Sequence, residues 1–87
     1  PIKSITIPEG IEIIDAYAFN SCNVLSSVTL PSSLRIINHA AFYLTINLKE
    51  LDLKNTQFIG EDNFELCESL RNLSINTENN FYSTYEG

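Results

Sequence analysis

The chain has 87 residues, a formal net charge of −6 and a pI of about 4.4, so it holds one domain at most. Its five basic residues, none adjacent in the sequence, argue against nucleic-acid binding, which needs clusters of Lys and Arg. No apolar run approaches the ~18 residues of a membrane helix, so no membrane insertion is expected here. The chain starts at Pro1 and stops inside a repeat, so we expect it to be a piece of a longer protein.

A unit of about 23 residues recurs along the chain. Its first copy, Ser4–Leu25, reads SITIPEGIEIIDAYAFNSCNVL, and the third copy has lost one residue near Thr56. Such a period predicts stacked supersecondary units, which need about three repeats to be stable. We therefore predict one domain over residues 1–87, made of repeats 3–25, 26–48 and 49–70 and a partial repeat 71–87.

Each unit opens with a short alternating segment that predicts a half-buried strand. In Ser4-Ile5-Thr6-Ile7 polar and apolar residues alternate, and Pro8 ends the strand because it has no N–H to donate. Successive strands are expected to stack in a parallel sheet, about 4.7–4.9 Å apart. The apolar rows face the interior: Ile5, Val28, Leu51 and Leu73, then Ile7, Leu30, Leu53 and Ile75. The polar rows face outward: Ser4, Ser27, Glu50 and Asn72, then Thr6, Thr29, Asp52 and Ser74.

The second half of each unit must return the chain to the next strand. We expect an extended stretch near residues 11–14 and a helical turn near residues 16–20. Phe19, Phe42 and Phe64 share one repeat position, which predicts the main internal stack of side chains.

One return position is apolar in all three repeats: Ile13, Ile36 and Phe58. These residues are either an exposed apolar stripe that contacts a partner or a second copy of the chain, or a satellite cluster buried by a twist of the return segment. Burial is the favoured interpretation, because isolated apolar residues on surfaces and in satellite clusters are common.

The repeated unit resembles the BspA-like class of leucine-rich repeats. The resemblance rests on Ile7-Pro8 at the end of the strand, then Ile14, Ala18-Phe19, Cys22 and Leu25, a pattern seen three times over residues 3 to 75. Repeat two departs at Thr45, where the class usually has Cys, and repeat three lacks the proline and has Asn63 in place of Ala.

The resemblance implies an α/β-type repeat solenoid, a right-handed superhelix with the parallel sheet on its concave face and short strand and helical-turn return segments. It also implies a secreted or cell-surface protein of host-associated bacteria or protozoa, which binds proteins and is not an enzyme.

The residues themselves suggest no catalytic, metal or cofactor site. Cys22 and Cys67 lie two repeats apart, about 10 Å at the strand spacing, which is too far for a disulfide. His39 occupies a variable, exposed repeat position, and a zinc site would need more His or Cys ligands. The acidic residues of repeat three are expected to form a solvated surface rather than a calcium site.

The leading hypothesis is an adhesion module that binds a protein, such as a host or matrix protein, through the two polar rows. Within these rows, Glu50 and Asp52 favour a basic partner. The alternative is a structural spacer whose parent protein carries recognition elsewhere, since the rows lack the Trp, Tyr and Arg typical of binding hot spots. The sequence assigns no oligomeric state.

Two features belong to the last, partial repeat. The aromatic group Phe81, Tyr82 and Tyr85 either caps the array or forms part of a return segment. Asn72-Leu73-Ser74 is a glycosylation sequon, relevant only in a secretory-pathway eukaryote.

Overall fold

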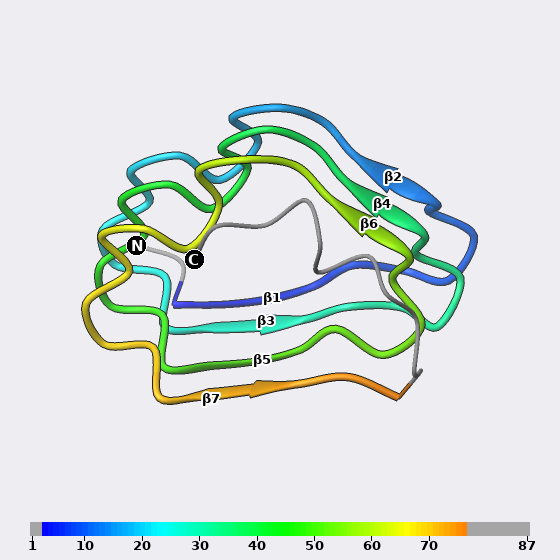
Figure 1. The fold of residues 1–87 in the computed structure, drawn as a ribbon. Coiled ribbons are helices and arrows are strands. Elements are labelled where there is room, and N and C mark those ends of the chain that lie inside the picture. Colours follow the sequence, from blue (N-terminus) through cyan, green and yellow to red (C-terminus); the bar gives the residue numbers. More distant parts are fainter. Residues whose placement is uncertain (1–2, 77–87) are drawn as a thin grey trace.

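A computed structural model describes residues 3–76, in which the chain passes alternately through two parallel sheets (Figure 1). The larger sheet has the order β1-β3-β5-β7 and the smaller one β2-β4-β6, so each full repeat supplies one strand to each. The strands of the larger sheet are β1 (Ser4–Thr6), β3 (Ser27–Thr29), β5 (Glu50–Asp52) and β7 (Asn72–Ser74). Those of the smaller sheet are β2 (Ile13–Ile14), β4 (Ile36–Ile37) and β6 (Phe58–Ile59).

The larger sheet has the register predicted from the repeat. Ser4 pairs with Ser27 and Thr6 with Thr29 between β1 and β3, and the pairing of β5 with β7 is equally regular. Between β3 and β5 the only paired position is Ser27 with Glu50. The sheet is therefore regular at both sides and looser in its middle.

The core lies between the two sheets and is built from the predicted rows. Phe42 is fully buried, and its ring stacks on Phe19 and Phe64 with centroid distances of 5.3 and 6.1 Å. The end rungs are less covered, because their strands have one neighbour each within the described residues: Ile5 is half-buried and Leu73 is exposed. The remaining main members of the core are Leu25, Val28, Leu30, Leu34, Ile37, Leu48, Leu51, Leu53 and Ile59.

The helical turn expected near residues 16–20 is wrong; residues 3–76 contain no helix, and hence none that could cross a membrane. Tyr17 and Ser21 have φ values of 63° and 61°, which a right-handed helix cannot contain. Their N–H groups donate across to the next repeat, to the carbonyls of His39 and Tyr43. These backbone groups thus stabilise the stacking of repeats instead of a helix.

Asn63 stands where the first two repeats have Ala, and it is fully buried. Its side chain accepts a hydrogen bond that a backbone carbonyl accepts in the first pair of repeats. In the first pair of repeats, the N–H of Phe19 donates to the carbonyl of Ala41 at 2.7 Å. In the second pair, the N–H of Phe42 donates to the Oδ1 atom of Asn63 at 3.1 Å. The Asn63 amide donates in turn to two backbone carbonyls, at 2.8 and 3.0 Å. The side chain is therefore fully hydrogen-bonded despite its burial.

Thr45 and Cys67, which share one repeat position, serve as equivalent hydrogen-bond donors. The hydroxyl of Thr45 donates to the carbonyl of Phe19 at 2.9 Å, and the thiol of Cys67 donates to that of Phe42 at 3.0 Å. Thr and Cys are interchangeable here because each is small and carries one donor.

Candidate functional site

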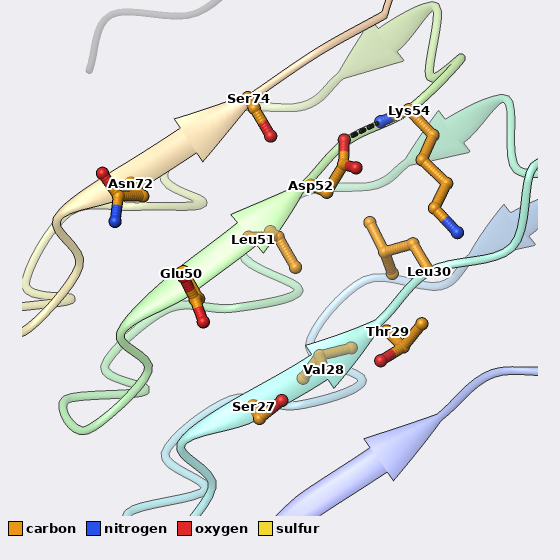
Figure 2. Close-up of a pocket in the computed structure, with 10 residues that line it drawn as sticks. All are labelled: Ser27, Val28, Thr29, Leu30, Glu50, Leu51, Asp52, Lys54, Asn72 and Ser74. Carbon is orange, nitrogen blue, oxygen red and sulfur yellow. Dashed lines mark hydrogen bonds between the residues drawn. The ribbon is translucent and has the colours of Figure 1, made fainter.

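The eight predicted polar residues lie together on the outward face of the larger sheet. In the view of Figure 2, Ser27, Glu50 and Asn72 form one row across the strands, and Thr29, Asp52 and Ser74 form the next. Ser4 and Thr6 extend both rows onto β1. Ser27 is half-buried and the other seven residues are exposed. The structure thus brings the predicted set together, and its role in binding stays a prediction.

A shallow hollow of about 260 Å³ interrupts this face across β3, β5 and β7 (Figure 2). It lies where the pairing of β3 with β5 is limited to one position. Beyond this position the Oδ1 atom of Asp52 accepts the N–H of Lys54 at 3.0 Å, and Lys54 has a φ of 50°. This local turn stands where the first two repeats have a proline and the fourth has Asn76.

The hollow carries charge of both signs on an otherwise neutral face. Glu50 and Asp52 are exposed, and the side chain of Lys54, which also lines the hollow, extends away from Asp52 toward Leu30 (Figure 2). The sequence-based set omitted Lys54. Its position directly after the strand, in place of a proline, was the available signal.

The apolar stripe of the return segments is more exposed than expected. Ile13, Ile36 and Phe58 do stack in register through the smaller sheet. However, Ile13 is 49% exposed, Phe58 is 40% exposed and Ile36 is half-buried. The favoured interpretation, burial, is wrong, because alternation along β2, β4 and β6 turns the following residue of each strand into the core instead.

The return segments also bring together three residues that sequence reasoning kept apart. Side chains of His39, Glu61 and Asp62 offer ligand atoms within 4.8 Å of one another, and His39 Nδ1 lies 3.9 Å from Asp62 Oδ2. The His39 and Asp62 side chains are 45% and 46% exposed, so a solvent-exposed polar contact accounts for the proximity. The signal in the sequence was the shared repeat position of His39 and Glu61, which makes them neighbours.

Both cysteines are free, and neither is placed as a nucleophile. Cys67 is buried, and burial raises the pKa of its thiol above the ordinary value. Cys22 is half-buried at the end of the array. A raised pKa disfavours the thiolate that nucleophilic chemistry needs.

The aromatic group at residues 81–85 lies outside the described residues.

Neither the curated proteins nor the solved structures contain a match to this chain. Residues 1–86 match the family described as the BspA type leucine rich repeat region (6 copies). Together with the repeat pattern and the paired parallel strands, this match shows that the chain belongs to the BspA-type leucine-rich repeat family.

Proposed function

We propose that this chain is a non-enzymatic, protein-binding module of a secreted or cell-surface protein, with a role in adhesion. Leucine-rich repeats are generally protein-binding modules and are typically not enzymes, and BspA-type repeats are common in surface proteins. The repeats are proposed to form part of a longer right-handed solenoid with the larger sheet on its concave face.

The observation that carries the proposal is the polar face of the larger sheet. Its rows consist of short side chains with hydrogen-bonding groups, held on strands with a fixed register. Because the strands are already ordered, little conformational entropy is lost when a partner binds. The hollow beside Asp52 gives this face a concave centre with two carboxylates, which supports a partner that presents a basic group.

The experiment compares binding to a panel of immobilised extracellular-matrix proteins by surface plasmon resonance. Thr29→Arg and Asp52→Arg place a large cation on the proposed contact face, and Gln57→Arg places the same group on an exposed site of the return segment. We expect the first two variants to lose at least tenfold in affinity for a bound matrix protein and Gln57→Arg to retain it. Equal affinity of all three variants would remove the larger sheet as the contact surface.

The spacer function remains the second candidate, favoured by one feature of the same face. Its rows consist of Ser, Thr, Asn, Asp and Glu, without the aromatic or Arg anchors that dominate most protein interfaces. A spacer predicts that the parent protein keeps its binding when all eight row positions are changed. The apolar stripe of Ile13, Ile36 and Phe58 stays a prediction as an additional contact.

A further inference from the structure

Three of the five basic residues of this acidic chain form a column at one corner of the structure. Lys3, Lys49 and Arg71 each occupy the position directly before a strand of the larger sheet, and Ser26 fills the same position before β3. The corner is the one where the chain enters β1, β3, β5 and β7 (Figure 1). Sequence reasoning discounted these cations because they are far apart in the sequence.

Backbone hydrogen bonds fix the column. The carbonyl of Lys3 accepts the N–H groups of Ser26 and Ser27, at 2.9 and 3.1 Å. The carbonyl of Ser26 accepts the N–H of Lys49 at 3.2 Å, and that of Lys49 accepts the N–H of Arg71 at 2.9 Å. At the strand spacing of about 4.8 Å, Lys3 and Lys49 are two rungs apart and Lys49 and Arg71 are one rung apart, so the column spans about 14 Å.

The charges of the column are exposed and have no counter-ion. Lys3, Lys49 and Arg71 are all exposed, and within residues 3–76 none of their cationic groups has a carboxylate within 4.0 Å. Both lysines line one hollow of about 290 Å³. Ser26, Asn47 and the exposed Val24 complete its walls. Two unpaired ammonium groups that share a hollow with a hydroxyl oxygen and an amide oxygen make a site for an anionic ligand that also donates hydrogen bonds.

We propose that this cationic column, Lys3, Lys49 and Arg71 with the hollow at Ser26 and Asn47, binds a sulfated polysaccharide. A sulfated sugar chain presents anionic groups at regular intervals along its length, and hydroxyl groups between them. The lysines pair with sulfates as point charges, and the Arg71 guanidinium can bind one in bidentate fashion. The Ser26 hydroxyl already donates to the carbonyl of Lys3, and the Asn47 amide donates to that of Asn23. The Ser26 oxygen and the Asn47 Oδ1 atom therefore serve as acceptors for sugar hydroxyls.

The walls of the hollow favour a sugar chain over an acidic peptide. A peptide that adds a strand needs free backbone groups, but along this column the carbonyls of Lys3, Ser26 and Lys49 already accept backbone N–H groups. A peptide held by its side chains needs apolar or aromatic anchor pockets, and Val24 is the one apolar residue that lines this hollow. Hydroxyl, amide and ammonium groups provide no such pocket.

The net charge of the chain does not prevent this binding. No acidic side chain lines the hollow at this corner, which is formed by Lys3, Lys49, Ser26, Asn47 and Val24. Glu50 and Glu68 are the carboxylates nearest to it in the sequence, next to Lys49 and three residues before Arg71. At physiological ionic strength the screening length is about 8 Å, so cations that touch the ligand outweigh carboxylates further away.

The test measures binding of dextran sulfate, with uncharged dextran and poly-L-glutamate as comparison probes, to the whole chain by isothermal titration calorimetry. The variant Lys3→Gln/Lys49→Gln removes two charges from the column, and the matched control Arg35→Gln/Lys54→Gln removes two from elsewhere. All four residues lie at the surface, and circular dichroism checks that each variant stays folded. We expect the column variant to bind dextran sulfate at least tenfold more weakly, and the control to lose less than threefold.

Two results would overturn the proposal. Equal losses in the two variants would show attraction to overall charge instead of a site. Equal affinity for poly-L-glutamate and dextran sulfate would assign the column to acidic peptides. Because dextran sulfate contains no protein, this experiment is independent of the proposed matrix-protein binding at the larger sheet.

Discussion

Replacing Phe42 by Ala tests whether the aromatic column holds the repeats together. The side chain is fully buried, and a Phe→Ala change at such a site destabilises by about 3–5 kcal/mol. It also removes two ring contacts, to Phe19 and Phe64, each contributing about 0.5–1.5 kcal/mol. A domain of this length has roughly 4–13 kcal/mol of stability in total. We therefore expect Phe42→Ala to lose much of it, or to unfold at 25 °C.

The measurement is urea unfolding followed by far-UV circular dichroism, in which the transition midpoint reports stability. Phe58→Ala is the matched control, because it removes the same side chain from an exposed position of the smaller sheet and should cost less than about 1 kcal/mol. Phe42→Leu keeps most of the volume and stays measurable if Phe42→Ala does not fold. Similar losses for Phe42→Ala and Phe58→Ala would refute the assignment of the core to this column.

Three further predictions concern polar groups inside the array, and each is followed by the same urea unfolding. Asn63→Ala restores the residue of the other repeats but removes the partner of the Phe42 N–H and of the Gly60 carbonyl, whereas the Asn38 carbonyl keeps the Ala41 N–H. We expect a loss of about 2–4 kcal/mol, and an unchanged midpoint would mean that the backbone closes the gap. Thr45→Val keeps the shape of the side chain but removes the donor to a buried carbonyl, and it should destabilise by about 1–3 kcal/mol. Thr45→Cys introduces the residue of the neighbouring repeats and should destabilise less. Equal losses in the two variants would show that the donor is unimportant. Burial raises the pKa of the Cys67 thiol, so the protonated thiol stabilises the fold below the ordinary thiol pKa of 9.0, and this contribution is lost as the pH rises above that value. The free energy of unfolding should therefore fall above pH 9.0 in the native chain but not in Cys67→Ala. A parallel fall in both proteins would assign the pH dependence to other groups.

The repeat register of the larger sheet was predictable because many positions specify it together. A shift of one residue would turn the rows containing Val28 and Leu51 to solvent and the rows containing Thr29 and Asp52 into the core. The hydrophobic pattern thus determined which residues face outward, and the candidate polar face followed from it. The period of 23 residues determined which residues are neighbours, because it places equivalent residues on adjacent rungs.

The return segments were less predictable, since their backbone conformation depends on the neighbouring repeat. Residues 16–20 have no local feature that excludes a helical turn, and the N–H groups of Tyr17 and Phe19 find acceptors only when the next repeat is in place. The exposure of Ile13 and Phe58 has a similar origin: each strand of the smaller sheet is two residues long, so the pattern alone does not say which of the two faces the core.

Stacking converts a residue's position in the repeat into its position in space, and this has a consequence for surface sites. Residues that are 22 or 23 apart become neighbours at about 4.8 Å per rung, as His39 and Glu61 do. Charges that are isolated in the sequence, such as Lys3, Lys49 and Arg71, therefore form a continuous column, although sequence adjacency gave no sign of one. In arrays of this kind a charge cluster has to be sought by repeat position, because the strand ladder, not the local sequence, decides which side chains meet.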